Sequence, residues 1–341
     1  MNARRRSLAL LGALALSVVL GGCAKKQDVI VSSGEGKALG DNAIDADPIA
    51  LLPGNAVGVY TLDAKALVAS PFGARLVSIA KARSPLPESS GFDPGRDLER
   101  VYGGLYSMQG ADSVGIAVGQ FKPEQIEQAA QAAMQPGGSP GNVPITRSEY
   151  AGRVFYTSRG LGFSVLTERT LLIGDETGIR RTLDRIQEGR VRRQLPDWML
   201  KTLENKSAPL AFGADLTSQP LPSAAREQLA FVDGLRTVAL LGNFADPGLN
   251  LAGTLTYGDD DAAQRGARNL KQLHGQLSSY APLMALLGIP QPVRSLDANA
   301  KEKEVRFVAG VDGAAVAVLL EKAEAYLSTL VPARPARAGG T

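Results

Sequence analysis

One histidine and one cysteine are all that this 341-residue chain offers of the side chains that most often act as general base, thiolate nucleophile or soft metal ligand. His274 lies at helical spacing with Leu270 and Leu277, which is typical of a residue packed at the edge of a core. A hydrolase would need that imidazole beside a nucleophile and an orienting carboxylate, and no motif supplies this arrangement. The same count argues against zinc or copper sites built from thiolates and imidazoles, so the sequence predicts no catalytic residue, metal or cofactor.

Two further patterns have a chemical and a structural interpretation. Ser78 and Lys81 fit the S-x-x-K spacing of penicillin-recognising enzymes, but the S-D-N and K-T-G elements that such enzymes also need are missing. We therefore expect both residues on the outer face of a surface helix. The run Asp259–Asp261 suggests a cation site, yet it leads directly into a helical pattern, where acids stabilise the N-terminus through the helix dipole.

Arginines form the strongest local basic patch, and such a patch could bind lipid headgroups or another polyanion. Its members are Arg180, Arg181, Arg185, Arg190, Arg192 and Arg193. The alternative is a solvated helix face, because Asp184 and Glu188 are interspersed to pair with these charges. Aromatic residues for base stacking are absent from this stretch, so nucleic acid is not expected as a partner.

The first 23 residues read as a secretory leader. Three arginines at positions 4–6 precede an apolar run from Leu8 to Leu20, which ends in Gly21, Gly22 and Cys23. A basic start, a short apolar stretch and small residues before a cleavage point are typical of a signal peptide. The run is shorter than the roughly 20 apolar residues that a membrane-spanning helix needs.

Leu20-Gly21-Gly22-Cys23 resembles the lipobox of bacterial lipoproteins. The resemblance implies cleavage between Gly22 and Cys23 and attachment of acyl chains to Cys23, and two or more acyl chains hold a protein stably to a membrane. Because Ala24 and Lys25 follow instead of an aspartate, the resemblance also implies sorting to the outer membrane, with the protein facing the periplasm.

The charge of the mature chain is neutral. The full sequence has 37 basic and 34 acidic residues, and removal of the leader takes away three arginines and no acid, leaving 34 of each. The sequence pI of about 8.9 therefore describes the precursor. Polyanion binding needs a standing excess of positive charge, which the mature chain lacks.

Composition divides the chain into segments. Residues 1–22 are the leader, and residues 23–50, rich in glycine, serine and mixed charges, are expected to be a flexible tether. Two α+β domains are expected over residues 51–206 and 207–331, followed by a disordered tail over 332–341. With Cys23 as the only cysteine, no disulfide can form within the chain, so burial of apolar residues must stabilise these domains.

Both halves repeat the order strand, helix, hairpin, helix, hairpin, helix. The clearest elements are a helix over 123–134, a hairpin over 238–257 with strict alternation in its second strand, and a helix that begins after a capping Asp175 and ends at Gly189. Hairpins separated by helices favour antiparallel sheet packed with helices. We expect an internal duplication of ferredoxin-like modules with split β-α-β connections.

The pattern Tyr150-x-Gly152-x-Val154-x-Tyr156, followed by Leu171–Gly174 and a helix, resembles duplicated domains of uncharacterised bacterial envelope lipoproteins. That family carries no activity to transfer. The sequence favours a non-enzymatic binding or scaffolding role towards an envelope protein, exerted from an outer-membrane anchor, and a cleft between the halves is the expected place for a ligand. Two alternatives stay open: a carrier of lipid or another hydrophobic ligand, and a hydrolase whose serines, lysines or carboxylates meet only in the fold.

Overall fold

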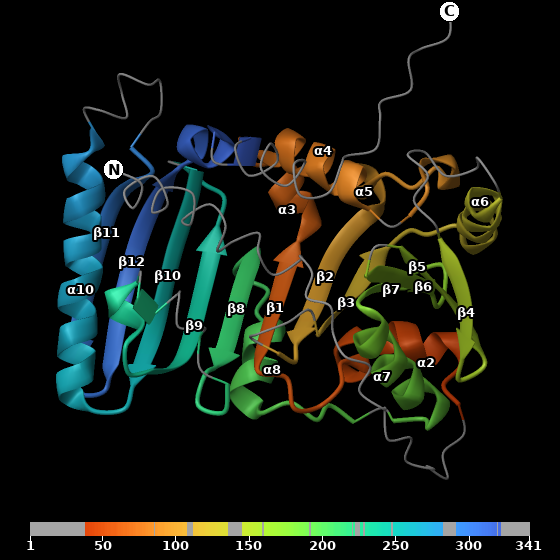
Figure 1. The fold of residues 1–341 in the computed structure, drawn as a ribbon, viewed down its shortest axis with the longest axis horizontal. Coiled ribbons are helices and arrows are strands. Elements are labelled where there is room, and N and C mark those ends of the chain that lie inside the picture. The colour runs from red at the N-terminus through yellow and green to blue at the C-terminus, as the bar shows by residue number, and fades with distance from the viewer. Residues whose placement is uncertain are drawn as a thin grey trace, which may run out of the picture.

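One antiparallel sheet of 12 strands runs along the longest axis of the molecule, and helices pack on its faces and along one end of its strands (Figure 1). This computed structural model confirms the predicted α+β class. It describes residues 38–84, 86–107, 112–135, 145–158, 160–190, 192–219, 221, 226–227, 229–246, 248–281, 291–318 and 320–321.

The strands follow one another in the sheet in the order β11-β12-β10-β9-β8-β1-β2-β3-β7-β6-β5-β4. The first half of the chain forms β1 (Gly58–Asp63), β2 (Leu98–Leu105), β3 (Ser113–Gly119), β4 (Thr146–Tyr150), β5 (Arg153–Ser158), β6 (Leu161–Val165) and β7 (Thr170–Gly174). The second half forms β8 (Leu210–Asp215), β9 (Leu235–Asn243), β10 (Gly248–Tyr257), β11 (Val293–Lys301) and β12 (Glu304–Asp312).

Helices connect these strands. The α-helices are α2 (Asp41–Ala46), α3 (Ala64–Val68), α4 (Gly73–Arg83), α5 (Pro94–Asp97), α6 (Pro123–Met134), α7 (Glu176–Gln187), α8 (Asp197–Leu203) and α10 (Asp260–Ser279), and residues 313–318 are also helical. The 3-10 helices are η2 (Pro48–Leu51), η3 (Glu88–Ser90) and η5 (Ala230–Val232). Within the described part of the chain, none of the helices has the length and hydropathy needed to cross a membrane.

The internal duplication is visible in the strand order. In the first half, β3 leads through α6 and the hairpin β4–β5 to β6, and β7 lies between β3 and β6. In the second half, β10 leads through α10 to β11, and β12 lies between them. Each half therefore contains the predicted split β-α-β connection, and the first half has one extra hairpin at the edge of the sheet.

The two halves join directly through their first strands. β1 pairs antiparallel with β8, and Tyr60 lies opposite Phe212 at the centre of this pair. Backbone hydrogen bonds thus continue from one half to the other. The expected boundary near residue 206 therefore separates two repeats within one sheet, and the described residues do not form two independent sheets with a cleft between them.

The faces of the sheet are covered differently in the two halves. In the first half, η2, α7 and α8 cover one face, which we call the front face, over a core that includes Val59, Ile116 and Leu183. The opposite face packs against α6 in the first half and against α10 in the second. On the front face of the second half, Leu241 and Val308 remain 37% and 60% exposed.

The folded body begins earlier than the sequence predicted. Residues 41–50 were expected to belong to the tether, but they lie in α2 and η2, where Ile44 and Ile49 are buried. The reason is the apolar content of this stretch, since Ile44, Ile49 and Leu51 all join the core of the first half. The predicted leader over 1–22 and the tail over 332–341 lie outside the described residues.

Candidate functional site

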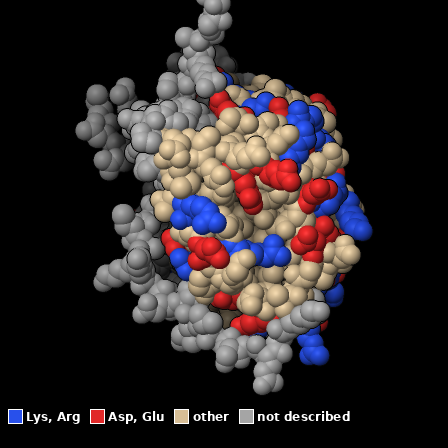
Figure 2. Space-filling model, turned by 90° about the vertical axis from the view of Figure 1, so that its right-hand side faces the viewer, with Lys and Arg blue, Asp and Glu red and all other residues tan. Residues whose placement is uncertain are grey.

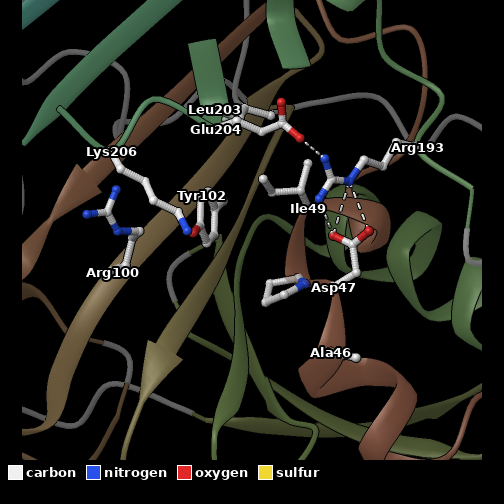
Figure 3. Close-up of a pocket in the computed structure, with 10 residues that line it drawn as sticks. Ala46, Asp47, Ile49, Arg100, Tyr102, Arg193, Leu203, Glu204 and Lys206 are labelled. Atoms are coloured by element: carbon white, nitrogen blue, oxygen red, sulfur yellow. Dashed lines mark hydrogen bonds and ion pairs between the residues drawn. The ribbon is translucent and has the colours of Figure 1, made fainter. Parts of the chain in front are cut away.

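A hollow of about 450 Å³ opens on the front face of the first half. Its walls are the segment 46–49 at the start of η2, strand β2, and the end of α8 with the turn that follows (Figure 3). Ile49 and Leu203 supply apolar lining, whereas the rest of the lining is mainly charged. Its volume lies within the range of small-molecule sites, about 300–1,000 Å³.

One end of the hollow is organised by Arg193. Its guanidinium donates from Nε to Asp47 Oδ2 at 2.9 Å and from a terminal nitrogen to Asp47 Oδ1 at 3.0 Å, and it also pairs with Glu204. Hydrogen bonding with Asp47 raises the pKa of Arg193 above its ordinary value. Two carboxylates therefore share a single cation at this end, which leaves a net negative charge there.

The other end carries Arg100, Tyr102 and Lys206. Arg100 and Tyr102 are two residues apart on β2, so their side chains project from the same face of the sheet. Arg100 donates to Asp63 Oδ2 at 2.8 Å. Lys206 is exposed and forms no ion pair with any described residue, and its side chain extends toward Tyr102 (Figure 3).

Burial raises the pKa of Tyr102 above its ordinary value of 10.0. Its hydroxyl is therefore neutral at physiological pH and can donate a hydrogen bond. Among the described residues that line the hollow there is no serine, cysteine or histidine. Its chemistry is accordingly that of charged hydrogen-bond donors and acceptors around a small apolar floor.

A second hollow, of about 590 Å³, lies between η3, α5, α6 and the turn that joins β6 to β7. Phe92 and Phe121 stack in its lining, with ring centroids 5.6 Å apart. Arg96 and Arg169, both of which line it, pair with Asp97 and Glu99. A hydrophobic-ligand carrier predicts an elongated apolar cavity, whereas both of these hollows have charged linings.

The predicted arginine patch does not exist as one exposed basic surface. Arg185 is only 3% exposed and donates to Ala50 O at 2.8 and 3.2 Å, to Gln194 Oε1 at 2.6 Å and to Arg192 O at 2.7 Å. Desolvation by this burial lowers the pKa of Arg185. It holds η2 and the loop after α7 together, which is a structural role.

Most of the remaining arginines of the patch form ion pairs within the protein, and they do not form one continuous basic surface. Arg180 donates to Glu176 and lies 4.6 Å from the ring centroid of Tyr150, and Arg181 donates to both carboxylate oxygens of Asp112 at 2.8 and 2.9 Å. Arg193 lines the hollow, Arg190 pairs with Glu188, and Arg192 is exposed. The end of the molecule that carries β4 and α6 shows acidic and basic residues interspersed (Figure 2). The alternative of a paired helix face describes these contacts better than a polyanion site.

The other described residues singled out from the sequence lie on helices or at the start of a helix. His274 lies on α10, Ser78 is exposed on α4, and Lys81 pairs with Asp93 at 2.6 Å. Asp259 caps α10 by accepting from the amide of Ala262 at 2.7 Å, as predicted for the acidic run. Within the described residues, no cluster of three or more histidine, cysteine, aspartate or glutamate side chains could hold a metal ion. Gly22 and Cys23 lie outside the described residues.

Sequence reasoning did not single out Tyr102, Lys206 or Asp47. The alternation of side chains along β2 places Arg100 and Tyr102 on one face, and this alternation can be predicted from the sequence. Nothing in the sequence indicates that residues 47 and 204, which are 157 positions apart, contact the same arginine.

Comparison with known proteins yields a likeness of structure alone. No family model matches the chain, and no curated protein matches its sequence. Three solved structures of TP0453 are similar: crystal form III with a TM-score of 0.49 and 11% identity, form I with 0.45 and 12%, and form IV with 0.44 and 12%. They cover 81%, 82% and 82% of this chain and 98%, 98% and 96% of theirs. Likeness at this level carries no conclusion about ligand or activity.

Proposed function

We propose that this chain is a lipid-anchored lipoprotein of the bacterial cell envelope, held at the outer membrane through Cys23, with a non-enzymatic binding role in the periplasm. The leader and the Leu20–Cys23 lipobox support the anchor. The binding role is supported by the hollow beside Tyr102, which gathers charged hydrogen-bond donors and acceptors.

The observation that carries the proposal is the fixed course of residues 39–51, the first described segment after the expected anchor. The amide of Leu39 donates to Ile186 O at 2.9 Å, and Asp45 Oδ1 accepts from Thr167 at 2.6 Å and from Thr170 at 2.7 Å. Further along, Asp47 pairs with Arg193. The chain that leads from the anchor is therefore held against the body and forms one wall of the hollow.

This attachment suits a protein whose binding site must keep one position relative to a membrane. A loose linker up to residue 50 would let the body rotate freely, whereas attachment at residues 39–47 shortens the expected tether to residues 23–38. The hollow then keeps a constant position relative to the point where the anchor leaves the body.

The anchor is tested by replacing Cys23 with serine in the full-length chain and fractionating the cells. We expect the wild-type protein in the outer-membrane fraction and the C23S variant unprocessed and outside that fraction. Unchanged processing and unchanged co-sedimentation of the C23S variant with outer membranes would overturn the proposal. A variant that carries the matching exchange at another apolar-flanked leader position, Ala15→Ser, serves as the control and should behave like the wild type.

A further inference from the structure

The hollow beside Tyr102 is electrically dipolar. At its acidic end, Asp47 and Glu204 share Arg193, so two negative charges face one positive charge. At its basic end, Arg100 pairs with Asp63, and Lys206 has no ion-pair partner among the described residues, so two positive charges accompany one negative charge. With Asp63 included, the hollow thus combines a surplus negative charge at one end with a surplus positive charge at the other, and these charges sum to zero.

The basic end also has spare hydrogen-bond donors. A guanidinium has five N–H groups, and Arg100 uses one of its terminal nitrogens for Asp63. The Tyr102 hydroxyl and the Lys206 ammonium line the same end. Arg and Lys donors of this kind bind carboxylate or phosphate oxygens through charge-assisted hydrogen bonds.

The acidic end can accept hydrogen bonds beyond those from Arg193. Each ionised carboxylate offers about four lone-pair positions. Asp47 uses its positions for Arg193 and for the amide of Ala50, whereas Glu204 accepts only from Arg193 among the described residues, so the free positions lie mainly on Glu204. The side chains of Asp47 and Glu204 are 33% and 49% exposed, so a ligand in the hollow can reach them without disturbing the core. An ammonium group is the complementary partner for this end, since it carries a positive charge and three donors.

We propose that the hollow binds a small zwitterion, with its carboxylate or phosphate at Arg100, Tyr102 and Lys206 and its ammonium at Asp47 and Glu204. This inference rests on the binding role proposed above. Complementary charge at both ends favours a zwitterion over a simple anion, because an anion gains at one end and is repelled at the other. The volume of about 450 Å³ admits a ligand of this size.

The test is a calorimetric titration of the protein, purified from the envelope in dodecyl maltoside micelles, with phosphoethanolamine and, separately, with inorganic phosphate. We expect phosphoethanolamine to bind more tightly than phosphate. Lys206→Gln should weaken both by about tenfold, which is the effect of losing one charge-assisted hydrogen bond. Glu204→Gln should weaken phosphoethanolamine by a similar factor and leave phosphate unchanged or tighter. Lys201→Gln, an exposed lysine on α8 that does not line the hollow, is the matched control and should leave both affinities unchanged.

Zwitterions of this chemistry include soluble molecules and phospholipid headgroups, and a second titration distinguishes them. In nanodiscs that contain phosphatidylethanolamine, a headgroup that enters the hollow would compete with added phosphoethanolamine and lower its apparent affinity, whereas an unchanged affinity assigns the site to a soluble ligand. Either result is consistent with the proposed site.

Absence of phosphoethanolamine binding by the wild type, or equal affinities for the wild type, the Lys206 variant and the Glu204 variant, would overturn the inference. Such a result would leave the anchor intact if C23S still abolished attachment to the outer membrane. Failure of the C23S experiment with phosphoethanolamine binding preserved would overturn the anchor alone.

Discussion

Replacement of Arg185 by methionine should loosen the attachment of the N-terminal segment to the body. Arg185 is buried, and none of the described carboxylates is hydrogen-bonded to it; its guanidinium donates to two backbone carbonyls and one side-chain amide. Methionine has a comparable length and keeps most of the packing, so the change removes the hydrogen bonds without opening a large cavity.

The expected cost follows from the groups that lose their donor. Ala50 is 2% exposed, so its carbonyl would stay buried without a partner, at a cost of roughly 1–3 kcal/mol. Gln194 and Arg192 are exposed residues whose oxygens can turn to water, which limits their contribution to about 0.5–1.5 kcal/mol each. Release of the guanidinium from its desolvated position offsets part of this sum. We therefore expect R185M to lower the free energy of unfolding by about 2–4 kcal/mol, a large share of the ~5–15 kcal/mol typical of a folded protein.

Urea denaturation measures this loss, and hydrogen exchange locates it. Amides in residues 39–51 should exchange faster in R185M, including that of Leu39, which donates to α7. Arg192→Met is the control, because that side chain is exposed and the exchange should change stability by no more than about 0.5 kcal/mol. Equal stability of R185M and R192M, or equal amide hydrogen exchange in residues 39–51 of the two variants, would show that Arg185 does not hold this segment to the body.

Further predictions concern other parts of the fold. On α10, Gly266→Ala should destabilise the protein, because an added Cβ would lie 2.3 Å from the Tyr257 hydroxyl. At Gly275 an added Cβ meets no atom within 4 Å, so Gly275→Ala should stabilise the protein by about 0.5–1 kcal/mol. Thermal unfolding of the two variants measures both effects. Burial raises the pKa of Asp175 above its ordinary value of 3.8, so the folded state binds that proton more readily than the unfolded state does. The stability of the wild type relative to Asp175→Asn should therefore fall as pH rises from about 3.8 through the raised pKa and stay constant above it, and a parallel pH dependence in the two proteins would contradict this. Asp45→Ala should cost about 1–3 kcal/mol, because two threonine hydroxyls lose their acceptor; denaturation that is unchanged from the wild type would show that this contact adds nothing.

Local elements with strong sequence signals were predicted well. The helix over 123–134 has the bounds expected from its N-terminal proline and its alanine-rich face. Asp175 caps α7 by accepting from the amide of Gly178 at 2.9 Å, and Gly189 after its end has a positive φ of 67°. In these cases the residues that decide the structure are neighbours in sequence, so periodicity and capping rules suffice.

Elements that depend on tertiary packing were missed. α2 and η2 lie in a stretch whose glycines and charges indicated a tether, and burial of a few apolar residues against the first half overrides that composition. α8 has seven residues and is stabilised by packing on β1 and β8, since a helix of this length is not stable alone. Continuation of the sheet through β1 and β8 is a pairing of strands about 150 residues apart, and no local pattern encodes it.

The candidate site shows the same limit. The arginine patch was read from positions that are adjacent in sequence, yet Arg185 and Arg193 turn in different directions because their partners, Ala50 and Asp47, lie about 140 residues earlier in the chain. Charge spacing along a helix indicates that arginines and acids can pair, but it does not identify the partners. The hollow beside Tyr102 exists only because these distant segments meet.

The anchor at Cys23 is the claim on which the proposed function depends most, and mass spectrometry of the N-terminal peptide tests it directly. Protein purified from the envelope of a bacterium that expresses the full-length chain is digested, and the first peptide is identified by its intact mass. We expect a mature chain that begins at Cys23 and carries covalently attached acyl chains. A first peptide that retains residues before Cys23, or one that begins at Cys23 without acyl chains, would contradict it.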